Sequence, residues 1–118
     1  MTLTAIYKLA RNSSYNDETK AKYKRAALKF LRELAKYLNL GKDSFSIHFN
    51  AGGIAVAGDA ILHHDKFYIN LTPFGNSGGY WRECAGQKDY SGKYNRFILE
   101  RETVESLGSA IRNVICAK

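Results

Sequence analysis

The chain has 118 residues, of which 45% are hydrophobic and 25% are charged. This composition is typical of one globular domain, residues 1–118, and excludes a disordered chain. The longest apolar runs fall short of the about 18–20 residues that a membrane-spanning helix needs, and the N-terminus lacks a signal-peptide pattern. We therefore expect no membrane contact and a cytoplasmic location. The net charge is +7, from 18 Lys and Arg against 11 Asp and Glu, which favours an anionic partner.

The first two predicted helices lie at the N-terminal end. Apolar residues from Leu3 to Ala10 recur at helical spacing, which predicts a short helix. A longer helix is predicted from Asp17 to about Leu38, with Gly41 as its C-terminal stop. The apolar residues of this helix fall on one face and are Tyr23, Ala27, Phe30, Leu31, Leu34 and Leu38.

Basic residues occupy the opposite side of this long helix. They form a row that we call the basic stripe: Lys22, Arg25, Lys29, Arg32 and Lys36. Glu33 is the one acidic residue between Lys20 and Lys36, whereas soluble helices usually mix both signs. The stripe is either an ordinary solvated face or a binding surface, and we take it as a candidate binding site.

Three strands with short turns are predicted after this helix. Phe45 to Asn50 alternate apolar and polar side chains, Ile54 to His63 form a longer run, and Phe67 to Leu71 follow a tight turn. These strands form an antiparallel meander. Gly58 interrupts the second strand, and a bulge there would decide whether Ile61 or Leu62 faces the core.

Simple alternation along the strands predicts which side chains lie on the sheet face away from the core. The candidates for binding on this open face are His48, Asn50, Tyr68 and Asn70. These polar and aromatic side chains project opposite Ile47 and Ile69.

A fourth strand is predicted from Tyr80 to Ala85 and a fifth, at the edge, from Phe97 to Leu99. Val104, Leu107 and Ile111 then have the spacing of a C-terminal amphipathic helix. The predicted fold class is α+β: an antiparallel sheet of four to five strands with a meander core, packed on one face by two amphipathic helices. The other sheet face is expected to be partly open.

No residue pattern indicates catalysis or a metal. His63 and His64 are adjacent on a strand and point to opposite faces, so they rarely bind one ion. The glycine-rich segments lack the lysine and Ser/Thr of a phosphate loop, and no serine lies in a nucleophile elbow. Cys84 and Cys116 are too few for a metal cluster and are predicted to be unpaired thiols. We expect no catalytic residue, cofactor or metal, although a small enzyme remains an alternative.

The segment after Tyr80 combines aromatic and basic side chains. Its candidate binding residues are Arg82, Lys88, Tyr90, Lys93, Tyr94 and Arg96. Rings of this kind stack on bases or anchor a protein interface, and the cations meet phosphate or carboxylate. The alternative is an ordered surface loop whose tyrosines pack onto the sheet.

Two runs carry a resemblance to known proteins. They are GGIAVAGD, from Gly52 to Asp59, and YWRECAGQKDYSG, from Tyr80 to Gly92. Together they resemble a pattern in small accessory proteins of phages and plasmids, over about residues 45–97. The resemblance implies a mobile-element origin and brings no catalytic residues. Inhibitors of CRISPR-Cas and other bacterial defence systems are a prominent class of such proteins.

Two functions follow as expectations. The first is a non-enzymatic accessory protein that inhibits a bacterial defence complex, such as CRISPR-Cas, by binding it in the host cytoplasm. The second is a nucleic-acid-binding protein without sequence specificity, which uses the basic stripe and the tyrosine-rich segment. In both, the partner is anionic: an acidic face of a host defence complex, or nucleic acid.

Overall fold

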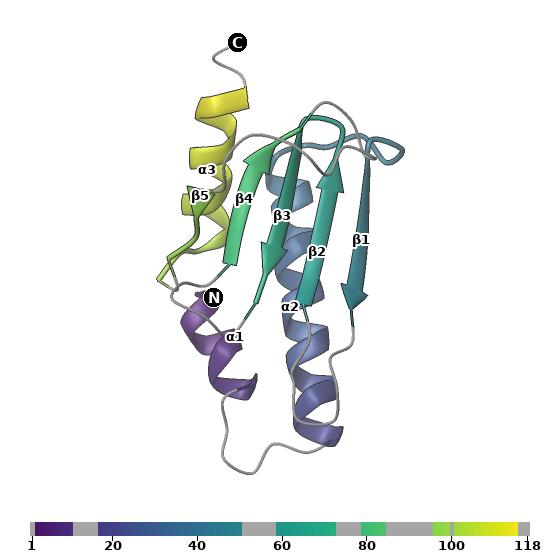
Figure 1. The fold of residues 1–118 in the computed structure, drawn as a ribbon, viewed down its shortest axis with the longest axis vertical. Helices are drawn as coiled ribbons and strands as arrows, with labels where there is room; N and C mark the ends of the chain where they lie inside the picture. The colour runs from purple at the N-terminus through teal and green to yellow at the C-terminus, as the bar shows by residue number, and fades with distance from the viewer. Residues whose placement is uncertain are drawn as a thin grey trace.

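The computed structural model describes residues 2–10, 17–50, 59–72, 79–84, 96–99 and 101–115. Its helices are α1 (Leu3–Ala10), α2 (Asp17–Tyr37) and α3 (Val104–Ile115). Its strands are β1 (Phe45–Asn50), β2 (Asp59–His64), β3 (Phe67–Leu71), β4 (Gly79–Glu83) and β5 (Arg96–Phe97). The strands form one open antiparallel sheet in the order β1-β2-β3-β4-β5 (Figure 1). The predicted α+β class is confirmed.

The strand register decides which side chains face the helices. Ile47 pairs with Leu62, Leu62 with Ile69, and Ile69 with Trp81, so this row crosses one face of the sheet. Leu62, and not Ile61, belongs to the apolar core on that face. Gly58 and the predicted strand residues 54–57 lie outside the described residues.

All three helices lie on one side of the sheet (Figure 1). The long helix α2 buries Phe30, Leu31 and Leu34 against the strands, as its helical spacing predicts. The short helix α1 adds Leu3, Ile6 and Tyr7, each fully buried, and α3 adds Val104, Leu107 and Ile111. The two predicted amphipathic helices, α2 and α3, thus contribute to the core on one sheet face, and the short helix α1 packs on α2.

Strand ends differ from the prediction by one or two residues. Gly79, and not Tyr80, begins β4; its φ of +126° suits glycine, and a Cβ there would clash with the carbonyl of Asn70. β5 is Arg96–Phe97 and not Phe97–Leu99, although the Ile98 N–H still donates to the Gly79 carbonyl at 2.9 Å. Ala85, the predicted end of the fourth strand, lies outside the described residues.

The C-terminal stop of α2 is Asn39 and not Gly41. Asn39 adopts a left-handed φ of 59°, which asparagine tolerates better than most residues. Its N–H donates to the Lys36 carbonyl, and the Leu40 N–H donates to the Ala35 carbonyl, both at 3.0 Å. These two bonds form a Schellman motif. Gly41 instead accepts bonds from the N–H and hydroxyl of Ser44.

The start of α3 also fixes the N-terminus of the chain. Thr103 Oγ1 accepts from the Ser106 N–H at 3.1 Å, and Ser106 Oγ accepts from the Thr103 N–H at 2.8 Å, which is a reciprocal helix cap. Thr2 pairs with Thr103, and the Leu3 N–H donates to the Glu102 carbonyl. α1 is thereby tied to α3. Among the described residues, no helix combines the length and the apolar character needed to cross a membrane.

Replacing Phe30 by alanine should destabilise the protein severely. Phe30 is 2% exposed, and truncating a buried phenylalanine typically lowers the free energy of unfolding by about 3–5 kcal/mol. Denaturant unfolding measures this loss. The exposed Arg25→Ala variant is the control and should stay within about 0.5 kcal/mol of the parent. A Phe30→Ala protein as stable as that control would remove Phe30 from the core.

Replacing Gly108 by alanine should destabilise α3, although alanine is the better helix former. A Cβ at Gly108 would lie 2.7 Å from Tyr37 Cε1 and 3.2 Å from Leu34 Cδ1. Tyr37 cannot easily move away, because the Arg112 guanidinium lies 4.8 Å from its ring and donates to its carbonyl at 2.7 Å. Overpacking of about 1–3 kcal/mol therefore outweighs about 1 kcal/mol of helix propensity. The neighbouring Ser109→Ala, at an exposed position, should be slightly stabilising; equal melting temperatures for both variants would contradict the close packing.

Candidate functional site

The basic stripe lies on the exposed side of α2. Each of its five residues is exposed in the structure: Lys22, Arg25, Lys29, Arg32 and Lys36. At about 1.5 Å per residue, the row from the first to the last is about 21 Å long. The burial of Phe30, Leu31 and Leu34 places the stripe on this side, because the opposite face of an amphipathic helix must meet water.

Neighbouring carboxylates neutralise the stripe only in part. Glu18 forms an ion pair with Lys22 at 3.5 Å, and Glu33 forms one with Lys29 at 4.0 Å. Arg25, Arg32 and Lys36 form no ion pair with any residue that the structure describes. The stripe therefore keeps a positive charge that a partner's carboxylates or phosphates can neutralise.

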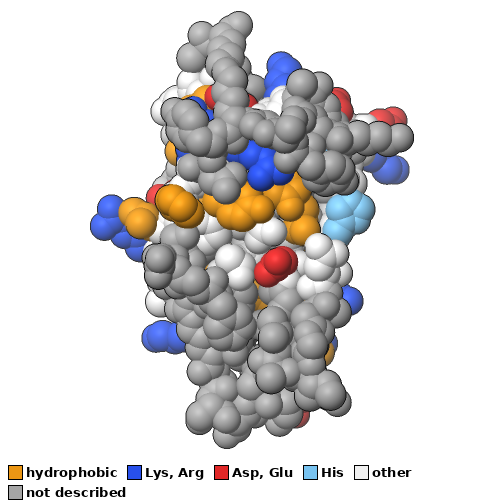
Figure 2. Space-filling view, viewed as in Figure 1, with side chains coloured by type: hydrophobic (Ala, Val, Ile, Leu, Met, Phe, Trp, Pro, Cys, Tyr) orange, Lys and Arg blue, Asp and Glu red, His pale blue; other side chains and the backbone are white. Residues whose placement is uncertain are grey.

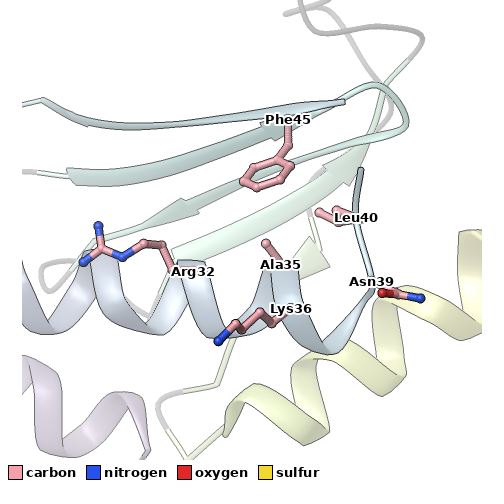
Figure 3. A pocket seen from close by; sticks show the side chains of 6 residues that line it. All are labelled: Arg32, Ala35, Lys36, Asn39, Leu40 and Phe45. Atoms are coloured by element: carbon pink, nitrogen blue, oxygen red, sulfur yellow. The ribbon is translucent and has the colours of Figure 1, made fainter. Parts of the chain in front are cut away.

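The flank of α2 that borders β1 also carries cations, namely Lys24 together with Arg32 and Lys36 of the basic stripe. Lys24 Nζ lies 5.4 Å from the ring centre of Phe49 in β1. Near the other end of the strand, a hollow of about 220 Å³ is lined by Arg32, Ala35, Lys36, Asn39, Leu40 and Phe45. Figure 3 shows Phe45, Ala35 and Leu40 pointing toward one another. Arg32 and Lys36 extend along α2 in the direction away from the helix end at which Asn39 lies.

Sequence reasoning missed this flank. Lys24 lies outside the predicted stripe, and the sequence predicts Phe45 and Phe49 only as apolar positions of an alternating strand. The signal that could have found the flank is the four-residue spacing of Lys24, Leu28, Arg32 and Lys36, which places these residues on one line along a helix. The spacing does not say that β1 lies beside this line, since that follows from the tertiary packing.

Two of the predicted binding arginines, Arg96 and Arg82, contact other side chains of the sheet. Arg96 pairs with Glu83 at 3.5 Å and lies 4.9 Å from the Trp81 ring, so it links β5 to β4. The Arg82 guanidinium lies 4.6 Å from the ring of Tyr68 and 5.8 Å from that of Tyr80. The other predicted residues of this segment, Lys88, Tyr90, Lys93 and Tyr94, lie outside the described residues.

The sheet face away from the helices carries a cluster of aromatic and polar side chains. Tyr68 lies at its centre: the His63 ring meets it edge-on at 5.1 Å, and the Tyr80 ring lies at 6.1 Å. Figure 2 views this face and shows a band of hydrophobic side chains across its central part, an acidic side chain below them and a histidine at the right edge. Tyr68 and Asn70 are only 7% and 8% exposed, so the expectation of an open face is wrong at these two positions.

Tyr68 has hydrogen-bonding neighbours within this cluster. Burial raises the pKa of Tyr68, and hydrogen bonds join its side chain to those of Asn70 and Tyr80. A neutral tyrosine beside a stacked Arg82 suits packing between strands. His48 and Asn50, the other two candidates on this face, are exposed on β1, where His48 Nε2 lies 3.1 Å from Ser46 Oγ.

The two neighbouring histidines separate as predicted. His63 faces Tyr68, whereas the His64 ring lies 4.8 Å from Phe67. His64 Nδ1 accepts a hydrogen bond from the Lys66 N–H at 3.1 Å, and the Cys84 thiol donates to the His64 carbonyl at 3.4 Å. Within the described ranges, no three His, Cys, Asp or Glu residues are grouped closely enough to hold a metal ion. Cys116 lies outside these ranges.

The sequence matches no protein-family model and no curated protein, and the fold matches no solved structure. The candidate site therefore depends on the chain's own residues. Among the described residues, the cationic side and flank of α2 combine exposure with positive charge that is only partly neutralised internally.

The unfolding free energy should depend on His64 at mildly acidic pH. Burial lowers the pKa of His64 below its ordinary value of 6.5, so the unfolded chain takes up the proton first as the pH falls. The contribution of neutral His64 to the free energy of unfolding is present above pH 6.5. It is lost as the pH falls through the folded-state pKa of His64. In His64→Asn, the side-chain oxygen can accept the Lys66 N–H without titrating. Denaturant unfolding between pH 7.5 and 5 should show a steeper loss in the parent; parallel curves would contradict the assignment.

Proposed function

We propose that this protein acts by binding, and that the basic stripe of α2 docks on an acidic surface of another protein. The observation that carries the proposal is the row of exposed cations, of which Arg25, Arg32 and Lys36 pair with no described carboxylate. Charge of this kind steers association and fixes register at protein interfaces. The proposed target is a host defence complex such as CRISPR-Cas, bound in the host cytoplasm.

An acidic protein surface suits the stripe better than nucleic acid does. Binding of single strands uses exposed rings on which bases stack. The aromatic residues of α2 are Tyr23 and Phe30, which are buried, and Tyr37, which is half-buried beside Arg112. Glu18 and Glu33 also lie beside the stripe, and a protein surface can present cations to them among its carboxylates, whereas a phosphate backbone cannot. Protein interfaces commonly combine both signs of charge and use arginine as an anchor.

The choice of a defence complex as target comes from the resemblance of residues 52–59 and 80–92 to accessory proteins of phages and plasmids. The resemblance implies a protein that acts by binding, as small single-domain proteins of that source often do. A small basic domain with an exposed cationic helix is suited to covering an acidic patch or the site of a nucleic acid on such a complex. The stripe supports the binding part of the proposal independently of this resemblance.

Charge reversal on the stripe should abolish inhibition and leave folding intact. In the Arg25→Glu, Lys29→Glu double variant, few stabilising contacts are lost, because exposed ion pairs contribute about 0–1 kcal/mol each. Bacterial strains that each carry one defence system, CRISPR-Cas systems first, are challenged with a sensitive phage. We expect the parent protein to restore plaque formation in at least one strain, and the double variant to lose at least tenfold of that effect at an unchanged melting temperature.

The matched control carries the same charge change elsewhere. Lys8, on α1, and Lys66, between β2 and β3, are exposed and lie outside α2, so Lys8→Glu, Lys66→Glu should inhibit as the parent does. Failure of the parent in every strain, or equal inhibition by both double variants, would contradict the proposal. A mobility shift of DNA or RNA by the purified protein that weakens steeply between 50 and 200 mM salt would instead support nucleic-acid binding, since salt competes with phosphate contacts at these concentrations.

A further inference from the structure

Strand β1 forms one edge of the sheet (Figure 1). It pairs with β2 on one side and with no other strand in the part of the chain that the structure describes. The edge is six residues long, from Phe45 to Asn50. An edge strand presents backbone N–H and C=O groups that can pair with another chain.

The register shows which residues present these groups. The Asp65 N–H donates to the Ser44 carbonyl at 3.1 Å, which makes this a hydrogen-bonded pair of the ladder. Antiparallel ladders alternate hydrogen-bonded and non-hydrogen-bonded pairs. Counting in steps of two, Ser46, His48 and Asn50 bond to β2. The backbone groups that point away from the sheet are therefore those of Phe45, Ile47 and Phe49.

The side chains of these same three residues form an apolar surface toward α2. Phe45, Ile47 and Phe49 pack against the core but are only partly buried. Leu40, also partly buried, lines the same hollow as Phe45. The hollow between Phe45, Ala35 and Leu40 continues this surface at one end (Figure 3). An added strand at this edge would place alternate side chains over the apolar surface.

Cations border the apolar surface at both ends of β1. Lys24 lies over Phe49, and Arg32 and Lys36 lie beside Phe45. Lys24 and Lys36 are about 18 Å apart along α2 at 1.5 Å per residue, and six strand residues span about 17–20 Å. Carboxylates near the two ends of an added strand would therefore come close to these cations.

We propose that the edge of β1 binds an extended acidic segment of a partner protein by strand addition. Backbone bonds form to Phe45, Ile47 and Phe49, apolar side chains of the segment cover these residues, and its acidic side chains pair with Lys24, Arg32 and Lys36. The inference rests on the proposed function and specifies how the partner is held. A second copy of this chain is disfavoured as the occupant, because pairing β1 with β1 would bring the two sets of cations together.

The test uses a synthetic eight-residue peptide with Glu at both ends and alternating Val and Thr between them. Titration into the isotope-labelled protein, followed by NMR, gives the dissociation constant and the affected amides. We expect the largest changes at Phe45, Ile47 and Phe49, and slower hydrogen exchange of their N–H groups. A peptide with Lys in place of Glu should bind at least tenfold more weakly, because it repels the flank.

Two further variants separate backbone pairing from charge. N-methylation of alternate peptide residues, in the frame that faces β1, blocks the added ladder and should weaken binding at least tenfold, whereas methylation in the other frame should not. In the protein, Lys24→Glu, Lys36→Glu should weaken binding of the acidic peptide at least tenfold, and Lys8→Glu, Lys66→Glu should not. The N-methylated peptides act on the unchanged protein, so the result does not depend on how a variant folds.

Several outcomes would overturn the inference. These outcomes are that the acidic peptide fails to bind, that both methylation frames bind equally, or that the amide changes lie away from β1. Sedimentation showing a dimer that uses this edge would overturn it as well. Any of them would leave the proposed function standing if the Arg25→Glu, Lys29→Glu variant still loses inhibition, because those two residues lie outside the flank. Peptide binding without any defence inhibition would instead support strand addition and contradict the proposed target.

Discussion

The burial of one face of α2 against the sheet is the constraint on which the other features depend. Phe30, Leu31 and Leu34 hold the helix on the strands, and a buried helix face leaves the opposite side to solvent. That side contains the basic stripe. The same packing places Lys24, Arg32 and Lys36 beside β1. The core thus fixes both where the positive charge is displayed and which strand edge lies beside it.

Sequence periodicity was enough to predict the fold class, because each element has a strong repeat. The spacing of Phe30, Leu31 and Leu34 predicted α2, and alternation from Phe45 to Asn50 predicted β1. Element ends were less certain because competing residues satisfy the same geometry. Asn39 and Gly41 both suit the end of a helix, and only the hydrogen bonds of the Asn39 and Leu40 N–H groups show which residue ends α2.

The candidate site was predicted in part. Exposure of the stripe followed from the helical repeat, but the use of Arg96 in the ion pair with Glu83 did not, because β4 and β5 meet through tertiary structure. The burial of Tyr68 and Asn70 was missed for the same reason: alternation gives the face of a sheet and not its exposure. Lys24 was overlooked because its neighbour Phe49 comes from another element.

Lysine footprinting of the protein on its target tests the central claim most directly. A purified defence complex that the protein inhibits is mixed with it, exposed lysines are acetylated, and mass spectrometry measures the extent of modification at each. Docking through α2 predicts that Lys29 and Lys36 become protected in the complex, while Lys8 and Lys66, which are also exposed, react as they do in the free protein. Unchanged reactivity at Lys29 and Lys36, together with protection of Lys8 or Lys66, would contradict the account.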